Sequence, residues 1–314
     1  MTQTPKVRPD VQTFLDQLKA QPRPPMTTEV LAMIRTLPPE MMASMDLAVG
    51  ELAVDRTLEM PGPGGTIALR LFDPRAVREA GPVVVFYHGG GFCVGSVATH
   101  AALAAEIARS LDLPVVSVEY RLAPEAPWPA APDDAEAAAR WIADNCAALG
   151  REIDGLILCG DSAGGNLALV AALALRDAPA AVPVVGQVLL YPGVDTLTDY
   201  PSRTGFADGY GLNGADMVLF EQHYCGDGAS WRHSPLKADL ACLAPTVLAT
   251  AALDPLRDEG RALAAKLALA GCEVAFRELA GTIHGFATYR KAIPSAVGDL
   301  AAVCALAQAM LSRG

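Results

Sequence analysis

Residues 156–165, LILCGDSAGG, carry the strongest structural signal of this chain. They join an apolar run, Leu156 to Cys159, to an alanine- and leucine-rich run that begins at Asn166. A serine with a glycine two positions away on each side, on a turn from strand to helix, predicts a nucleophile elbow. Large side chains would collide in so tight a turn, so the glycines leave the hydroxyl of Ser162 exposed at the helix N-terminus.

Around this turn, strand-like and helix-like runs alternate along the chain. Such alternation predicts an α/β fold, in which helices cover both faces of a mostly parallel central sheet. Before it, two strand-like runs between about residues 51 and 72 flank a turn cluster at 61–65, as in an antiparallel hairpin. We expect strands at 83–87, 115–119, 156–159, 187–191, 246–250 and 273–279, and helices at about 99–110, 133–148, 163–176, 256–270 and from 294 onward.

Two segments depart from the alternation. Residues 1–46 are divided by prolines and contain two short amphipathic stretches, which predict helices packed on a larger body. Residues 192–244 form an interruption that is too long for a simple loop, and 214–224 within it has a helical pattern. We therefore expect an α/β domain at 47–314 and a helical cap, built from segment 1–46 and from an insertion at about 195–232.

Charge and composition exclude several classes of partner. The chain has 314 residues and a formal net charge of −11, and no basic stripe suggests binding to nucleic acid. Its first residues lack an apolar signal region, and no apolar run is long enough to span a membrane. Seven scattered cysteines form no Cys-x-x-Cys pair. We expect a cytoplasmic protein with a small-molecule partner, no metal site and no membrane insertion.

A serine nucleophile needs a base, and the base needs a carboxylate that orients it. Of the three histidines after Ser162, only His284 directly follows an expected strand, whereas the other two lie in the insertion. Asp254 follows the strand at 246–250 in the same way. The carboxyl ends of parallel strands share one edge of a sheet, so the three side chains should meet there. Asp258 and Glu259, one turn into the next helix, are expected to face away or to balance the charge of its N-terminus.

Acyl transfer also needs hydrogen-bond donors for the oxygen that becomes negative. The stretch 88–92, HGGGF, directly follows the strand at 83–87, and glycines let a backbone approach a ligand closely. We expect the amides of Gly90 and Gly91, with that of Gly89 as a further candidate, to join the amide of Ala163 in an oxyanion hole. His88 is expected to brace the loop.

In their order and spacing, these motifs resemble those of hormone-sensitive-lipase-like α/β-hydrolases, bacterial carboxylesterases with an HGGG loop. The resemblance spans about residues 84–290 and includes YRLAPE at 120–125, SPL at 234–236, DPLRDEG at 254–260 and HGF at 284–286. One departure is APW at 126–128, where such proteins often carry His-Pro followed by Phe or Tyr.

The resemblance implies roles for individual residues. Ser162 would be the nucleophile, His284 the base and then the acid, and Asp254 the group that orients it, beneath a mobile cap and without a cofactor. It also implies that Arg121 and Glu125 form a pair that braces the surrounding loops.

The sequence thus predicts a serine carboxylesterase that hydrolyses short to medium acyl esters through an acyl-enzyme. Phe92 and Phe286 adjoin the motifs and are predicted to contact substrate. The alternatives are an amidase, a lactonase or another acyl hydrolase with the same triad, or a non-catalytic small-molecule receptor, which is disfavoured because His284 stands in its motif. The strand at 273–279 is expected to be a sheet edge suited to a homodimer.

Overall fold

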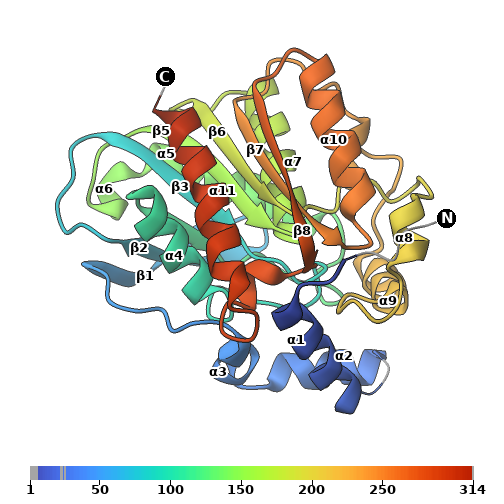
Figure 1. Ribbon diagram of the computed structural model, residues 1–314. Coiled ribbons are helices and arrows are strands. Elements are labelled where there is room, and N and C mark those ends of the chain that lie inside the picture. The colour runs from blue at the N-terminus through green and yellow to red at the C-terminus, as the bar shows by residue number, and fades with distance from the viewer. Residues whose placement is uncertain (1–5, 22–23, 25, 313–314) are drawn as a thin grey trace.

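The computed structural model describes residues 6–21, 24 and 26–312, and an eight-stranded sheet forms its centre (Figure 1). The strand order is β1-β2-β4-β3-β5-β6-β7-β8, with antiparallel pairing of β1 with β2 and of β2 with β4, and parallel pairing elsewhere. The predicted α/β class is therefore confirmed. The strands are β1 (Val54–Gly62), β2 (Gly65–Asp73), β3 (Gly81–Tyr87), β4 (Val115–Val118), β5 (Ile153–Asp161), β6 (Val184–Leu190), β7 (Thr246–Leu253) and β8 (Val274–Ile283).

Helices cover both faces of this sheet. One core cluster joins it to α5, α7 and α10, and a second joins it to α1, α4 and α11. No helix in the described ranges is long and apolar enough to cross a membrane. The helices are α1 (Pro9–Ala20), α2 (Thr28–Thr36), α3 (Pro39–Met42), α4 (Ala101–Leu111), α5 (Ala130–Asp144), α6 (Cys146–Leu149), α7 (Ala163–Asp177), α8 (Pro201–Gly205), α9 (Gly214–Tyr224), α10 (Arg257–Leu269) and α11 (Ser295–Leu311), with short 3₁₀ turns at Ala43–Met45, Pro235–Lys237 and Phe286–Thr288.

The central strands are apolar because both of their faces are covered. Val83 to Tyr87 of β3 are fully buried, and the β-branched valines suit a pleated, packed surface. One predicted helix differs: the run at 133–148 forms α5, which ends at Asp144, and then the separate short helix α6. Asn145 separates them with φ −124° and ψ 46°, a conformation outside the helical region.

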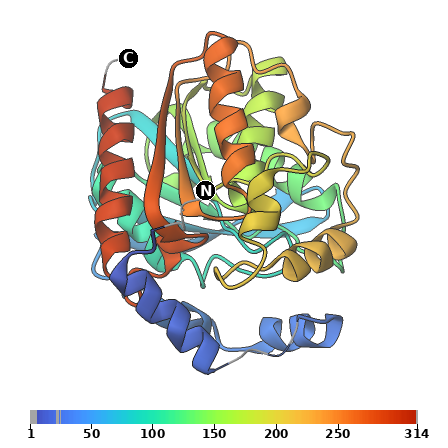
Figure 2. The same ribbon diagram turned by 45° about the vertical axis from the view of Figure 1, so that its right-hand side comes forward.

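Two groups of helices lie at one side of the sheet. Helices α1 to α3 form a group beneath it in Figures 1 and 2, and α9 lies on the same side. Residues 191–245, between β6 and β7, contain α8 and α9; the second coincides with the helix predicted at 214–224, whereas the first was not predicted. Some residues of the N-terminal segment, 1–5, 22–23 and 25, lie outside the described part. Strand β8 is an edge strand, as predicted, while a homodimer through it stays a prediction.

The elbow after β5 is as tight as its glycines indicate. Ser162 has φ 54° and ψ −119°, a conformation that non-glycine residues rarely adopt. A Cβ on Gly160 would lie 2.2 Å from the carbonyl oxygen of Gly164, and a Cβ on Gly164 would lie 1.9 Å from that of Tyr87. The turn between β5 and α7 therefore packs directly against the end of β3.

We predict that Gly164→Ala destabilises the protein by about 3 kcal/mol or more, because the methyl group must displace backbone rather than a movable side chain. The measurement is the midpoint of urea unfolding. Gly298→Ala is the matched control, since that glycine lies within α11 and a Cβ there meets nothing within 4 Å. The control should be neutral or stabilising by up to about 1 kcal/mol. Equal midpoints for the two variants would contradict the steric argument.

Candidate active site

Four loops meet beyond the carboxyl ends of parallel strands. Ser162 follows β5, Asp254 follows β7, His284 follows β8 and the glycines 89–91 follow β3. Because these strands run parallel in one sheet, their carboxyl ends share an edge, where α/β folds bind ligands. The structure thus brings together the three side chains that the sequence singled out.

Hydrogen bonds link these three side chains in a row. His284 Nε2 lies 2.9 Å from Ser162 Oγ, and His284 Nδ1 lies 2.7 Å from Asp254 Oδ2. The other carboxylate oxygen of Asp254 accepts a hydrogen bond from the amide of Leu256 at 2.8 Å, and its side chain is fully buried. This arrangement holds the imidazole with one nitrogen on the hydroxyl and the other on a fixed carboxylate.

The electrostatic environment favours the protonated form of His284. Burial by itself would lower the pKa of this imidazole, but the charge and hydrogen bond of Asp254 outweigh that effect and raise the pKa above its ordinary value. The carboxylates of Asp161 and Glu259 act in the same direction. A base that gains a proton during a reaction would be stabilised here by three negative groups.

Two of the three glycine amides that the sequence predicts as oxyanion donors are left without an acceptor. The amides of Gly90 and Gly91, and that of Ala163 at the start of α7, have no acceptor among the described residues. The amide of Gly89 instead donates to Asp161 Oδ1 at 2.8 Å. The prediction of Gly89 as an oxyanion donor is therefore wrong, because the carboxylate beside the elbow occupies its N–H.

Asp161 and His88 support the loop from behind. Asp161 accepts the Gly89 amide and lies 3.7 Å from His100 Nε2. His88 is buried, its Nδ1 lies 2.8 Å from the Gly89 carbonyl oxygen, and its ring stacks on Tyr120 with centroids 4.2 Å apart. Burial lowers the pKa of His88 to about 3, so its ring is neutral at physiological pH. His88 braces the loop, as the sequence predicts.

A cavity of about 1000 Å³ opens beside Ser162 and His284. Helices α2, α3 and α9 contribute to its wall, together with the loops that follow β3 and β6. Phe92 lines it and stacks on Tyr224 with ring centroids 3.9 Å apart. The space and the lining suit a small organic substrate with an apolar part.

Phe286 lies elsewhere than the sequence suggests. Its side chain is fully buried, packs edge-on against Tyr191 with centroids 5.1 Å apart and is absent from the cavity wall. The turn at Phe286–Thr288 directs the ring into the core beneath the site. The prediction that Phe286 contacts substrate is therefore wrong, because its ring packs in the core instead.

The pairing inferred for Arg121 and Glu125 is also wrong. Arg121 donates to Asp134 of α5, at 2.8 and 2.7 Å, because that buried carboxylate lies closer to its guanidinium. Glu125 pairs instead with Arg35 of α2, which also donates to the carbonyl of Ala123. The second pair joins the N-terminal segment to the rest of the protein.

Sequence reasoning missed several polar residues of the cavity wall, namely His100, Asp161, Asn166, Asp195, Arg203 and Glu259. Asp161 could have been found, since it directly precedes Ser162 and shares its turn. Glu259 stands within the DPLRDEG stretch but was not expected in the site. No local pattern marks the other four, whose positions follow from packing. Among the described residues, no group of three histidine, cysteine, aspartate or glutamate side chains is placed to hold a metal ion.

Comparison with known proteins places this geometry in a family. A family model described as alpha/beta hydrolase fold matches residues 84–288. Esterase LipI of Mycobacterium tuberculosis is 37% identical over 258 residues, which cover 80% of this chain and 78% of the relative. Carboxylesterase NlhH of the same species is 36% identical over 266 residues, covering 82% and 81%.

Solved structures agree over nearly the whole chain. An ester hydrolase from the Lake Arreo metagenome, complexed with a bipyridine phosphonate derivative, superposes with a TM-score of 0.90 at 34% identity, covering 98% of this chain and 99% of that one. The esterase of Pyrobaculum calidifontis has a TM-score of 0.87 at 35% identity, covering 97% and 99%. The chain belongs to the α/β-hydrolase family of hormone-sensitive-lipase-like esterases. Its enzyme class is that of the carboxylic ester hydrolases.

We predict that NMR titration of the His284 imidazole gives a pKa above about 6.5, its ordinary value. In Asp254→Asn this pKa should fall below that value, since burial then acts without the main opposing charge. Asp161→Asn should lower it by less. An unchanged pKa in Asp254→Asn would contradict this account of the electrostatics.

Proposed function

We propose that Ser162, His284 and Asp254 form a catalytic triad that hydrolyses carboxylic esters of short to medium acyl chains. The observation that carries the proposal is the unbroken row of hydrogen bonds from the Ser162 hydroxyl through the imidazole to the buried carboxylate. The membership in a family of esterases supports the reaction class.

In the proposed reaction, Ser162 Oγ attacks the ester carbonyl while His284 Nε2 takes its proton. The carbonyl oxygen becomes negative and is bound by the amides of Gly90, Gly91 and Ala163. His284 then protonates the leaving alcohol oxygen, and the C–O bond of the ester breaks to give an acyl-enzyme. Water attacks the acyl carbon with His284 as base, and the carboxylic acid leaves as Ser162 regains its proton. Asp254 fixes the imidazole tautomer and stabilises the imidazolium throughout.

We further propose that segment 1–46 and the insertion at about 195–232 form a cap over the substrate. Both contribute to the wall of the cavity beside Ser162, through residues such as Ile34 and Leu37 of the first and Met217 and Val218 of the second. The two segments also touch, since Thr28 Oγ1 lies 3.2 Å from His223 Nε2.

The triad is tested with p-nitrophenyl butanoate. Ser162→Ala should lose about 10⁶-fold in kcat, since the nucleophile is absent. Asp254→Asn should lose about 10⁴-fold in kcat, since the imidazole then adopts the wrong tautomer. A phosphonate that titrates one equivalent of wild-type sites should not label the alanine variant. Full turnover by Ser162→Ala would overturn the assignment.

The cap proposal predicts a limit on acyl length. In a series of p-nitrophenyl esters from acetate through hexanoate to palmitate, kcat/KM of the wild type should rise and then fall. Met217→Trp should reduce kcat/KM for the longer esters by about tenfold, because the indole fills part of the cavity. Leu269→Trp is the matched control, since Leu269 is 89% exposed on α10. The same length profile in Met217→Trp and wild type would contradict a role for this wall in substrate selection.

A further inference from the structure

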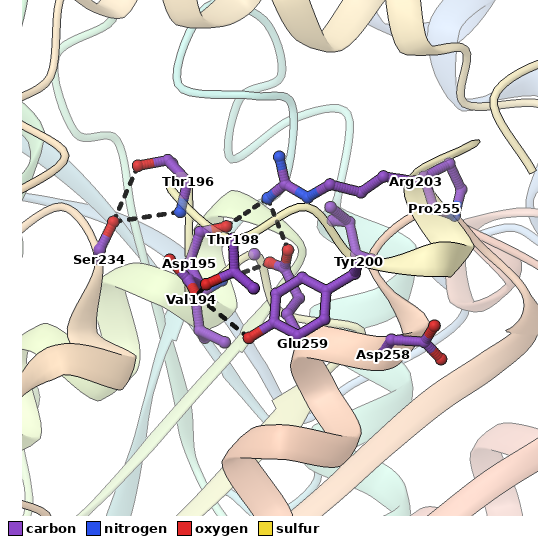
Figure 3. Close-up of polar contacts among 12 residues, drawn as sticks. Val194, Asp195, Thr196, Thr198, Tyr200, Arg203, Ser234, Pro255, Asp258 and Glu259 are labelled. Carbon is purple, nitrogen blue, oxygen red and sulfur yellow. Dashed lines mark hydrogen bonds and ion pairs between the residues drawn. The ribbon is translucent and has the colours of Figure 1, made fainter. Parts of the chain in front are cut away.

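Glu259 is a buried carboxylate that joins three segments of the site (Figure 3). It lies in the first turn of α10, shortly after Asp254, and is only 1% exposed. Its Oε1 accepts a hydrogen bond from the amide of Val194 at 2.6 Å, and its Oε2 accepts one from Arg203 of α8 at 2.7 Å. Arg203 also donates to the carbonyl oxygen of Asp195. Of the two expectations for Glu259, that it faces away is therefore wrong, whereas its place in the first turn of α10 is compatible with the other, a balance of the charge at the helix N-terminus.

The loop held by Glu259 lies against the elbow. The amide of Gly193 lies 3.4 Å from the carbonyl oxygen of Ser162, and Asn166 Nδ2 donates to the carbonyl of Gly193 at 2.7 Å. Val194, whose amide Glu259 binds, is the next residue. A change at this carboxylate can thus reach the backbone of the nucleophile through two covalently linked residues.

The Ser202 hydroxyl joins α8 to the Asp254 turn without using Glu259. Ser202 Oγ donates to the carbonyl of Pro255 at 2.8 Å and accepts from the amide of Asp258 at 3.2 Å. Asp258 Oδ2 in turn accepts from the amide of Ser202 at 3.0 Å. This second contact offers a control that holds the same helix without the charge of Glu259.

Glu259 also acts on the catalytic base by its charge. It lines the cavity with Ser162 and His284, and its negative charge raises the pKa of His284. Its ionised form is useful to the site in two ways: it accepts two hydrogen bonds at once, and it favours the imidazolium.

We propose that Glu259, held by Arg203, is a positioning residue for ester hydrolysis. In its ionised form it holds the loop at Gly193 and Val194 against the Ser162 elbow and stabilises protonated His284. This inference rests on the proposed triad. When the carboxylate gains a proton, it loses its attraction to both the guanidinium and the imidazolium, so the rate should fall.

Several groups set the pH range over which Glu259 gains its proton. Burial raises the pKa of Glu259 to about 7, while Arg203 and the amides of Val194 and Asp195 oppose the rise. The charge of Glu259 also raises the pKa of Tyr200, which precedes α8, and of His284, which follows β8. The carboxylate therefore changes its charge within the range in which an esterase is assayed.

The test compares wild type with Glu259→Gln, whose side chain has the shape of the protonated acid and cannot ionise. We expect kcat for p-nitrophenyl butanoate to be about tenfold lower than wild type near pH 9, with KM nearly unchanged. Near pH 5 the ratio of the two rates should approach one, because Glu259 is then protonated in the wild type. Protonation of His284 lowers both rates on acidification, and the part of this effect that is equal in the two proteins cancels in the ratio of their kcat values.

Two further variants separate positioning from general structure. Ser202→Ala removes the two uncharged hydrogen bonds of the Ser202 hydroxyl and keeps its amide bond to Asp258, so any loss of rate should be the same at every pH. Arg203→Met removes the cation beside Glu259, so the loss of rate on acidification should begin at a higher pH than in wild type, whereas Arg203→Lys should keep it close to the wild-type position. If thermal unfolding shows that Glu259→Gln is not folded, the pH dependence of the two Arg203 variants tests the proposal instead.

If the ratio of kcat in Glu259→Gln to kcat in wild type stays constant across pH, the inference is overturned. It is also overturned if the rate of Arg203→Met falls on acidification at the same pH as that of wild type. Ser162→Ala separates this failure from failure of the proposed function. If that variant is inactive while the ratio is constant, only the role of Glu259 is wrong. If it turns over fully, the triad itself is wrong.

Discussion

The contact between the start of α7 and the end of β3 is the constraint on which the site depends. Gly164 lies so close to the carbonyl of Tyr87 that a methyl group cannot enter. This approach places the amide of Ala163 beside the glycine loop that continues from β3, and it also places Asp161 where its carboxylate can take the amide of Gly89. The proposed donors and the proposed nucleophile are therefore held by backbone packing rather than by flexible side chains.

Around His284 the protein gathers negative charge in a buried place. Asp254, Asp161 and Glu259 all favour the imidazolium, although burying carboxylates is costly. Each is compensated locally by hydrogen bonds: Asp254 by His284 and the Leu256 amide, Asp161 by the Gly89 amide, and Glu259 by Arg203 and the Val194 amide. The groups that stabilise these charges also fix the loops of the site, so the electrostatics and the geometry have the same origin.

The helices over the cavity are attached by contacts of different kinds. Helix α8 is held by the buried Ser202 contacts and by Glu259, whereas α2 is held in part by the pair of Arg35 and Glu125, whose carboxylate side chain is 68% exposed. Exposed ion pairs contribute little to stability, typically about 1 kcal/mol or less. The proposed cap thus has one part that buried polar contacts join to the site, and another part that is joined through the buried side chain of Leu31 and an exposed ion pair.

The sequence by itself determined the α/β class, the elbow and the three side chains that meet in the site. Alternating apolar runs set strands and helices locally, and the parallel arrangement then brings Ser162, Asp254 and His284 to one edge of the sheet. Only the tertiary structure decided which partners the surrounding polar groups take. Asp161 takes the Gly89 amide, Arg121 turns to Asp134, Phe286 enters the core and Glu259 turns toward Arg203. These choices join residues far apart in the chain, so they depend on how loops and helices pack, which no local pattern encodes.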